Sequence, residues 1–188
     1  MRIALFGGTF DPVHHGHLIL ARDAIEQLKL DRVIFIPAAL SPHKPGTFPA
    51  PAALRRDMLA AAIAEEPGQA MDECELKRSG PSYTIDTVEL MRAQFVGAEL
   101  FYLIGHDNLR KLNTWHRVDE LRRLVQFVVF DRGQEVVEHA NPVLRRRIDV
   151  SATEIRQRIA RGASIRYLVP EPVRILIERN HLYQEEAY

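Results

Sequence analysis

Short apolar runs alternate with amphipathic helical patterns along this chain. Runs rich in β-branched and aromatic residues, which predict buried strands, lie at 3–6, 32–37, 99–104 and 125–130. Weaker patterns predict two more strands, at 71–78 and 148–150. Because strands that alternate with helices form parallel sheets covered on both faces, we predict an α/β fold with a Rossmann-like open parallel sheet.

Apolar periodicity and capping residues predict the helices between these strands. The expected helices begin near Gly16, cover 52–66 and 82–91, start again after Ser151, and close the chain after Pro170 and Pro172. The first should bury a face made of Leu18, Ala21, Ile25 and Leu28. We expect a single domain over 1–188, with a small helical C-terminal portion from about 151 to 188.

The third helix carries two candidate caps. Either Ser82 or Thr84 can cap it, and Asp86 in its first turn suits the helix dipole. Its apolar face is predicted to contain Ile85, Val88 and either Leu90 or Met91.

The segment between the first strand and the first helix carries the chemistry. The string GGTFDPVHHGH places Gly7 and Gly8 in a turn, where the absence of a side chain lets a ligand approach the backbone. The first N–H groups of the following helix have no internal partner and lie at its positive end. Strand, glycine turn and helix start together predict a phosphate site.

His14 and His17 fall near that helix start. Each imidazole can donate a hydrogen bond to a phosphate oxygen, and a protonated ring also carries charge. In the alternative interpretation, one histidine is a surface residue and the other is a local cap. The segment lacks both G-x-G-x-x-G and a Walker G-K-[ST], so it predicts neither a redox dinucleotide site nor a P-loop.

A second candidate phosphate site lies at 147–162, RIDVSATEIRQRIARG. Ser151 and Glu154 have the spacing of a capping box, which explains those two residues by structure alone. Thr153 and Arg156 lie in the first turns of the same predicted helix, where a bound anion would sit.

Composition and net charge limit the classes of binding partner that the chain is expected to have. The chain has 188 residues and a formal net charge of zero, so nothing in its charge favours nucleic acid or an anionic membrane. No apolar run reaches the roughly 18–20 residues of a membrane span. The single cysteine, Cys74, excludes an internal disulfide, and no signal peptide is visible, so we expect a cytoplasmic protein. No pattern defines an oligomeric state.

With these residues in view, GGTFDPVHHGH resembles the HxGH signature of the nucleotidylyltransferase superfamily, and its GGTFDP start resembles the bacterial nicotinate-mononucleotide adenylyltransferase branch. Four further segments resemble the same family in the same order. They are SPHK at 41–44, SYTIDT at 82–87, the G-x-D…W pattern from Gly105 to Trp115, and VSATEIR at 150–156, followed by a YLVP ending at 167–170. Two positions depart from the last motif: Val150 stands in place of an isoleucine, and Ala152 stands in place of a serine and removes one hydroxyl.

The resemblance implies roles for these residues. His14, His17 and Arg156 would be catalytic, contacting the phosphates of ATP. The implied ATP contacts are Gly7, Gly8, Thr9, Phe10, Gly105, Asp107, Arg132, Ser151 and Thr153. The implied contacts to the mononucleotide are Lys44, Tyr83, Thr84 and Trp115.

Several of these residues keep an ordinary alternative. Lys44 and Arg132 can be solvated cations, and Trp115 can anchor a loop instead of stacking on a pyridine ring. The family has a small residue where His106 stands, so the role of His106 is open.

One regularity supports the resemblance independently. Gly8, Pro37, Gly105, Arg132 and Ser151 each follow the end of a predicted strand. In an open parallel sheet, ligands bind outside this carboxyl edge, at the point where the strand order reverses.

The implied reaction transfers AMP from ATP to nicotinate mononucleotide, giving deamido-NAD and pyrophosphate by in-line displacement without a covalent intermediate. Mg²⁺ would arrive on the ATP phosphates, and no carboxylate cluster predicts a protein metal site. Nicotinamide mononucleotide as the acceptor stays open. Three other functions stay open. The chain could adenylylate phosphopantetheine, or it could be a sensor that binds nucleotide without turnover. It could also be a class I aminoacyl-tRNA synthetase core, although it lacks the KMSKS motif of those enzymes.

Overall fold

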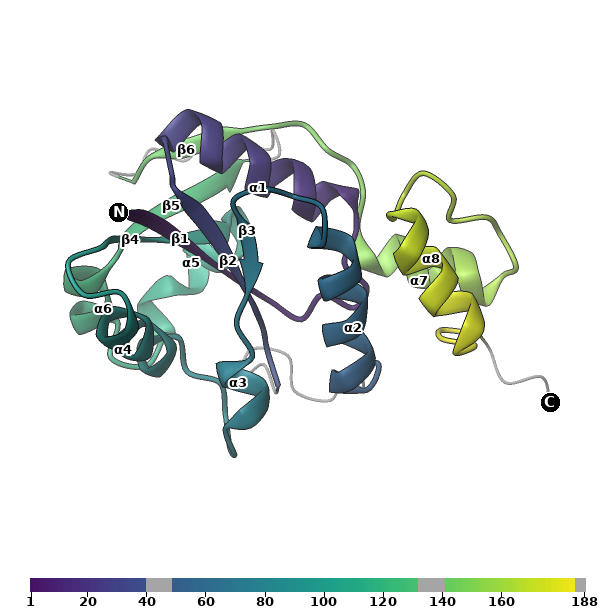
Figure 1. The fold of residues 1–188 in the computed structure, drawn as a ribbon, viewed down its shortest axis with the longest axis horizontal. Coiled ribbons are helices and arrows are strands. Elements are labelled where there is room, and N and C mark those ends of the chain that lie inside the picture. Colours follow the sequence, from purple (N-terminus) through teal and green to yellow (C-terminus); the bar gives the residue numbers. More distant parts are fainter. Residues whose placement is uncertain (40–48, 132–140, 185–188) are drawn as a thin grey trace.

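The computed structural model describes residues 1–39, 49–131 and 141–184. The elements run in the order β1 (Arg2–Gly8), α1 (His15–Leu28), β2 (Arg32–Pro37), α2 (Ala52–Ile63), β3 (Gln69–Met71), α3 (Cys74–Lys77), α4 (Thr84–Gln94), β4 (Glu99–Gly105), α5 (His106–Lys111), η1 (Leu112–Thr114), α6 (Val118–Leu124), β5 (Gln126–Asp131), β6 (Val143–Arg145), α7 (Ala152–Ala160) and α8 (Glu171–Arg179). Figure 1 shows α7 and α8 at one end of the molecule, with α8 beside α2.

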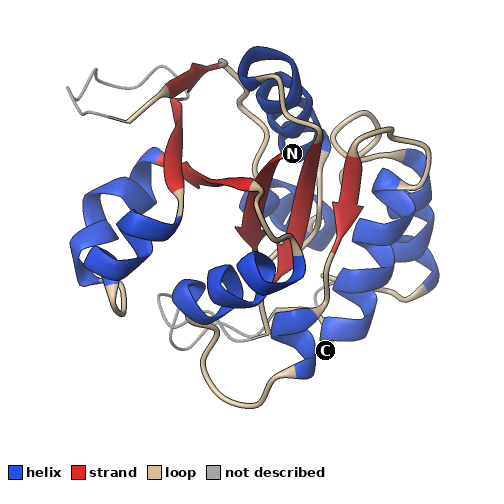
Figure 2. Ribbon diagram, turned by 60° about the vertical axis from the view of Figure 1, so that its left-hand side comes forward, coloured by secondary structure: helices blue, strands red, loops and turns tan. Residues whose placement is uncertain are grey.

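The strands form one sheet in the order β3-β2-β1-β4-β5-β6, and every neighbouring pair is parallel. β1 is central because its four consecutive buried residues, Ile3 to Phe6, can be covered on both faces. Helices lie on both sides of the strands in Figure 2. The predicted open α/β fold is therefore confirmed, and the strand order reverses between β1 and β4, where such folds bind ligands.

Alternating side chains of β1 enter two separate cores. Ala4 and Phe6 face the layer formed with α1, α2, α7 and α8. Ile3 and Leu5 face the layer formed with α4, η1 and α6. Because α7 and α8 contribute buried residues such as Ile155 and Val173 to the first layer, the C-terminal helices pack against the same core as the sheet.

Two predicted strands are wrong. At 71–78 the strand β3 ends at Met71, and Cys74–Lys77 is a short helix instead. At 148–150 the chain has no regular structure, and the last strand lies earlier, at Val143–Arg145. Both observed strands are only three residues long, so period-two alternation gives almost no signal there.

Helix boundaries differ in detail from the predictions. The N-cap of α4 is Tyr83, with no side-chain cap, so neither Ser82 nor Thr84 caps it. On its apolar face Met91 is buried and Leu90 is 48% exposed, which settles that choice. α8 begins at Glu171, so Pro172 lies inside its first turn, where the missing N–H costs nothing.

Candidate active site

The loop from β1 to α1 is packed tightly around Phe10. This residue is 2% exposed, has a left-handed φ of 49°, and meets the ring of His17 with 5.1 Å between centroids. A Cβ atom at Gly8 would lie 2.9 Å from the Phe10 ring, and one at Gly7 would lie 2.3 Å from the hydroxyl of Tyr102. Both glycines end β1, so the predicted turn at Gly7 and Gly8 is wrong. A side chain at either position would have to displace a packed aromatic ring, and the approach of a ligand to their backbone stays a prediction.

His14 and His17 form a stacked pair at the start of α1. Their ring centroids are 3.7 Å apart, with 26° between the ring planes. The backbone N–H of His14 donates to Nδ1 of His17 at 3.3 Å. Because Nδ1 accepts this bond, the hydrogen of a neutral His17 ring sits on Nε2, which can donate to an anion. His14 is the N-cap residue and is 2% exposed, whereas His17 is only partly buried.

Gly16 makes this stack possible. A Cβ atom at Gly16 would lie 2.9 Å from Nδ1 of His14 and 3.4 Å from Cγ2 of Ile148. The first distance is too short for a carbon–nitrogen contact, so a larger residue would displace the His14 ring. Sterics therefore explain why the residue between the two histidines, at position 16, is a glycine.

Arg156 reaches this loop from α7. Its Nη1 donates to the backbone carbonyl of Asp11 at 2.7 Å and lies 3.7 Å from Oδ2 of the same residue. Ser151 caps α7 as predicted, because its Oγ accepts the N–H of Glu154 at 3.1 Å. Arg156 therefore contacts the segment that leads to His14, across 145 positions of sequence. The expectation that Arg156 and the two histidines contact the same ATP stays a prediction.

Asp11 and Arg55, which sequence reasoning missed, hold the loop in place. Oδ1 of Asp11 accepts the N–H of Ala50 at 3.1 Å and the hydroxyl of Tyr183 at 2.7 Å. Arg55 is 1% exposed and donates to three backbone carbonyls. These carbonyls belong to Thr9, Ala38 and Ala50, at 2.8, 2.8 and 2.9 Å.

These contacts shift two ionisation equilibria. Burial lowers the pKa of Arg55, and the neighbouring Asp11 carboxylate opposes that shift. Burial and the bond to Asp11 raise the pKa of Tyr183, so its phenol stays protonated and donates. A signal for Arg55 existed in the sequence, because it shares a helical face with the apolar Met58 and Leu59.

The start of α4 presents the residues expected at the mononucleotide. Tyr83 is 36% exposed, and its ring lies 4.6 Å from that of His116. Thr84, the first residue of α4, is partly buried. Trp115 is only 9% exposed and packs edge-on against Tyr102 and Phe127. Its geometry favours the loop-anchoring alternative, and stacking on a ligand stays a prediction.

The remaining predicted residues are placed only in part. Gly105 ends β4, and a Cβ atom there would meet nothing within 4 Å. His106, the first residue of α5, is partly buried. Asp107 lies in α5, and its side chain is outside the described part of the structure. Lys44 and Arg132 lie outside the described residues altogether.

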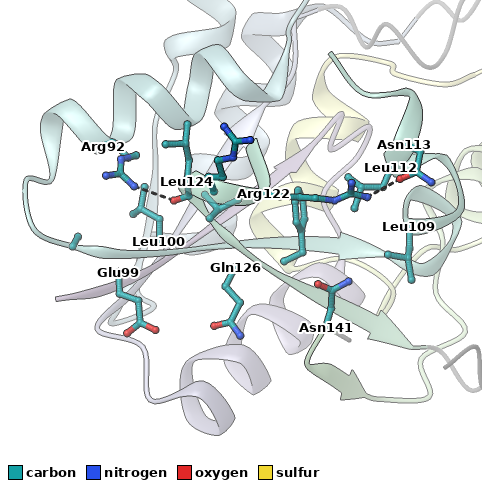
Figure 3. Close-up of a pocket in the computed structure, with 14 residues that line it drawn as sticks. Arg92, Glu99, Leu100, Leu109, Leu112, Asn113, Arg122, Leu124, Gln126 and Asn141 are labelled. Atoms are coloured by element: carbon teal, nitrogen blue, oxygen red, sulfur yellow. Dashed lines mark hydrogen bonds between the residues drawn. The ribbon is translucent and has the colours of Figure 1, made fainter. Parts of the chain in front are cut away.

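Two hollows lie away from this loop. One, of about 880 Å³, opens at the amino ends of β4 and β5, where Glu99 and Gln126 point outward and Arg122 bonds Asn113 (Figure 3). The other, of about 500 Å³, lies between α7 and α8. Neither is lined by the histidine pair or by Arg156, so neither forms part of the candidate site.

Within residues 1–39, 49–131 and 141–184, no three His, Cys, Asp or Glu side chains gather in a way that could hold a metal ion. No helix in those ranges is both long and apolar enough to cross a bilayer.

Comparison with known proteins assigns the chain to a family. The family model described as "Cytidylyltransferase-like" matches residues 5–158. A protein of Exiguobacterium sibiricum named "Probable nicotinate-nucleotide adenylyltransferase" is 45% identical, and the match covers 97% of this chain and 99% of that protein. A protein of the same name from Thermus thermophilus is 43% identical over 98% of this chain and all of that protein. The chain belongs to the nicotinate-nucleotide adenylyltransferase family. It is therefore a nucleotidyltransferase.

A solved structure agrees with this adenylyltransferase assignment at the level of the fold. The Plasmodium falciparum nicotinic acid mononucleotide adenylyltransferase complexed with NaAD matches with a TM-score of 0.79, covering 97% of each chain at 16% identity. The same Plasmodium enzyme complexed with APC matches with a TM-score of 0.77. At this identity the likeness shows the shared fold alone.

Proposed function

We propose that the chain transfers AMP from ATP to nicotinate mononucleotide, releasing pyrophosphate and forming deamido-NAD for NAD biosynthesis. Membership of the adenylyltransferase family supports the substrates. The observation that supports this proposal is the contact of Arg156 with the backbone carbonyl of Asp11, three residues before the stacked pair of His14 and His17. One cytoplasmic domain over 1–188 is part of this proposal.

The proposed roles follow from charge. The acceptor phosphate attacks the α-phosphorus of ATP in line, so no protein nucleophile is needed and catalysis is positioning plus charge stabilisation. Nε2 of His17 donates to a phosphate oxygen as negative charge develops on the leaving pyrophosphate. His14 supports that ring by stacking and lies at the positive end of α1. The backbone of Gly7 to Phe10 lines the reacting centre.

The other end of ATP is assigned to α7. Arg156 keeps donors beyond the one bonded to the carbonyl of Asp11, and these hold the β- and γ-phosphates together with Thr153 and Ser151. Gly105 and Asp107, at the end of β4, are assigned to the adenosine side, and Arg132 to the phosphates. Magnesium enters with ATP as the MgATP substrate, since this ion keeps most of its ligands from water and phosphate.

The mononucleotide is assigned to the region around α4. The N-terminus of α4, with Tyr83 and Thr84, suits the carboxylate of the nicotinate ring because unpaired N–H groups point out of a helix start. Lys44 is assigned to the phosphate of the mononucleotide and Trp115 to its ring. A turnover assay with the acid and the amide mononucleotides in parallel tests this assignment, and we expect faster transfer to the acid.

The test of the proposed chemistry is His17→Ala. We expect kcat for AMP transfer to fall by roughly 10²–10³, the size of a lost charge-stabilising donor, with an unchanged circular dichroism spectrum. His15→Ala is the matched control, because its side chain belongs to the same string but not to the stacked pair. A near-normal kcat for His17→Ala, or an equal loss in the control, would remove His17 from the mechanism.

A further inference from the structure

The last turn of the described chain is fastened to the β1–α1 loop. After α8, the backbone takes left-handed φ angles of 50° at His181 and 62° at Tyr183. These turns bring the hydroxyl of Tyr183 to within 2.7 Å of Oδ1 of Asp11, across 172 positions of sequence. The ring of Tyr183 also packs against the core layer formed with α1 and α2.

The Asp11 carboxylate contacts three separate segments of the chain, and its two oxygens have different neighbours. Oδ1 accepts two hydrogen bonds, from Tyr183 and from the N–H of Ala50. Oδ2 lies 3.7 Å from Nη1 of Arg156, which is beyond hydrogen-bond distance. The short contact of Arg156 is instead with the uncharged backbone carbonyl of Asp11, at 2.7 Å.

The other partners of the Asp11 carboxylate affect how strongly it attracts the guanidinium of Arg156. A guanidinium and a carboxylate with no other partners frequently form a bidentate ion pair with two parallel hydrogen bonds. The donors from Tyr183 and Ala50 offset part of the Asp11 charge and fix its plane. Arg156 therefore stays at the loop without a close ion pair to Asp11, and its Nη2 lies 3.5 Å from Oγ1 of Thr153 on α7.

We propose that Tyr183 is a positioning residue for the triphosphate of ATP: by donating to Asp11 it prevents that carboxylate from capturing Arg156. The inference deepens the proposed function and rests on it. It assigns the C-terminal turn a role in nucleotide affinity, beyond closing the core.

Tyr183→Phe removes only the hydroxyl and keeps the packed ring. Without it, Asp11 has lost one donor and draws Arg156 into the closer ion pair, which competes with the phosphates. We expect KM for ATP to rise roughly five- to tenfold, the size of one ordinary hydrogen bond, while KM for the mononucleotide stays within about twofold. Tyr167→Phe is the matched control, because Tyr167 is 81% exposed and belongs to the same C-terminal portion.

Repeating the substitution in an Asp11→Asn protein distinguishes a positioning role of Tyr183 from a role in holding the C-terminal turn in place. In Asp11→Asn there is no charge to capture Arg156, so adding Tyr183→Phe should change KM for ATP by less than about twofold. An undiminished effect in that background, or an unchanged KM for ATP in Tyr183→Phe alone, would overturn the proposal.

Equilibrium binding keeps the test independent of turnover and of the Asp11 variant. A non-hydrolysable ATP analogue, titrated into the full chain, should bind the Tyr183→Phe protein roughly five- to tenfold more weakly than wild type. Equal affinities would reject the role of Tyr183. If wild type binds the analogue but transfers no AMP, the proposed function fails while the binding comparison still judges Tyr183.

Discussion

At the scale of single residues, the smallest side chain in the signature decides how the two histidines meet. The sequence predicted that His14 and His17 lie at a helix start, and it did so because glycine turns and helix starts have local signals. It did not predict the 3.7 Å ring stack, which depends on what Gly16 leaves empty. The order of residue types along the chain does not determine how closely two side chains pack in space.

Gly16→Ala tests that dependence. Alanine favours a helix over glycine by up to about 1 kcal/mol. This gain offsets the cost of moving the His14 ring, so the free energy of unfolding should change little. The added Cβ would lie 2.9 Å from Nδ1 of His14, so the stack must open and we expect kcat to fall at least about tenfold. Wild-type kcat in this variant would show that the stack is unimportant. The measurement pairs chemical denaturation with steady-state kinetics.

Trp115 is the residue for which burial alters the sequence-based interpretation. Because the ring is 9% exposed and touches Tyr102 and Phe127, Trp115→Ala should lower the free energy of unfolding by about 3–5 kcal/mol. Under the stacking prediction, KM for the mononucleotide rises far more than KM for ATP. Equal changes in the two KM values would leave loop anchoring as its role.

At the scale of elements, the predictions succeeded where a strand is covered on both faces. Residues 32–37 were predicted as a strand and form β2 with the same bounds, because a continuous β-branched and aromatic run has few alternatives. The three-residue β3 and β6 had no such signal. The sequence also did not predict how the loops between elements are held together. Arg55 binds backbone carbonyls of three segments, and because every residue has such a carbonyl, no residue type marks the ones that are bound.

Arg55→Met should therefore destabilise the loops around the site. Methionine fills a similar volume but leaves the carbonyls of Thr9, Ala38 and Ala50 without their donor, so we expect a loss of about 3 kcal/mol or more in the free energy of unfolding. Arg56→Met is the control, because the Arg56 side chain is 39% exposed and pairs with Asp57 at the surface. Its cost should stay below about 1 kcal/mol. Similar losses in both variants would contradict the role assigned to Arg55.

The contact between α3 and α4 predicts a pH dependence. Burial raises the pKa of Glu75, against the opposing effects of bonds from Thr87 and Ser82 and the charge of Arg78. Above the ordinary value of 4.5 the unfolded chain loses this proton while the folded chain keeps it. The free energy of unfolding then falls with rising pH, up to the raised pKa of the folded state.

Glu75→Gln removes that proton equilibrium. We expect the stability of wild type relative to this variant to decrease as pH rises above about 4.5, and then to become constant. Thermal unfolding across that pH range provides the measurement. A difference that grows with rising pH would reverse the predicted sign.

At the scale of the whole molecule, the sequence predicted a parallel sheet but not the order of its strands. Alternation of strands with helices implies parallel pairing. β4, and not β3, pairs with the free edge of β1, and the chain reaches that edge through the long connection that contains α3 and α4. The contacts of Arg156 and Tyr183, from the end of the chain, with Asp11 near its beginning were likewise not predicted.

The central position of β1 has a consequence for synthesis on the ribosome. One edge of β1 pairs with β2, which is made soon afterwards, but the other pairs with β4, where Ile3 meets Leu100. At roughly 5–20 residues per second of translation, that apolar edge waits several seconds for its partner. During this interval the nascent chain exposes an unpaired strand edge that is able to pair with a neighbouring nascent chain on the same messenger RNA.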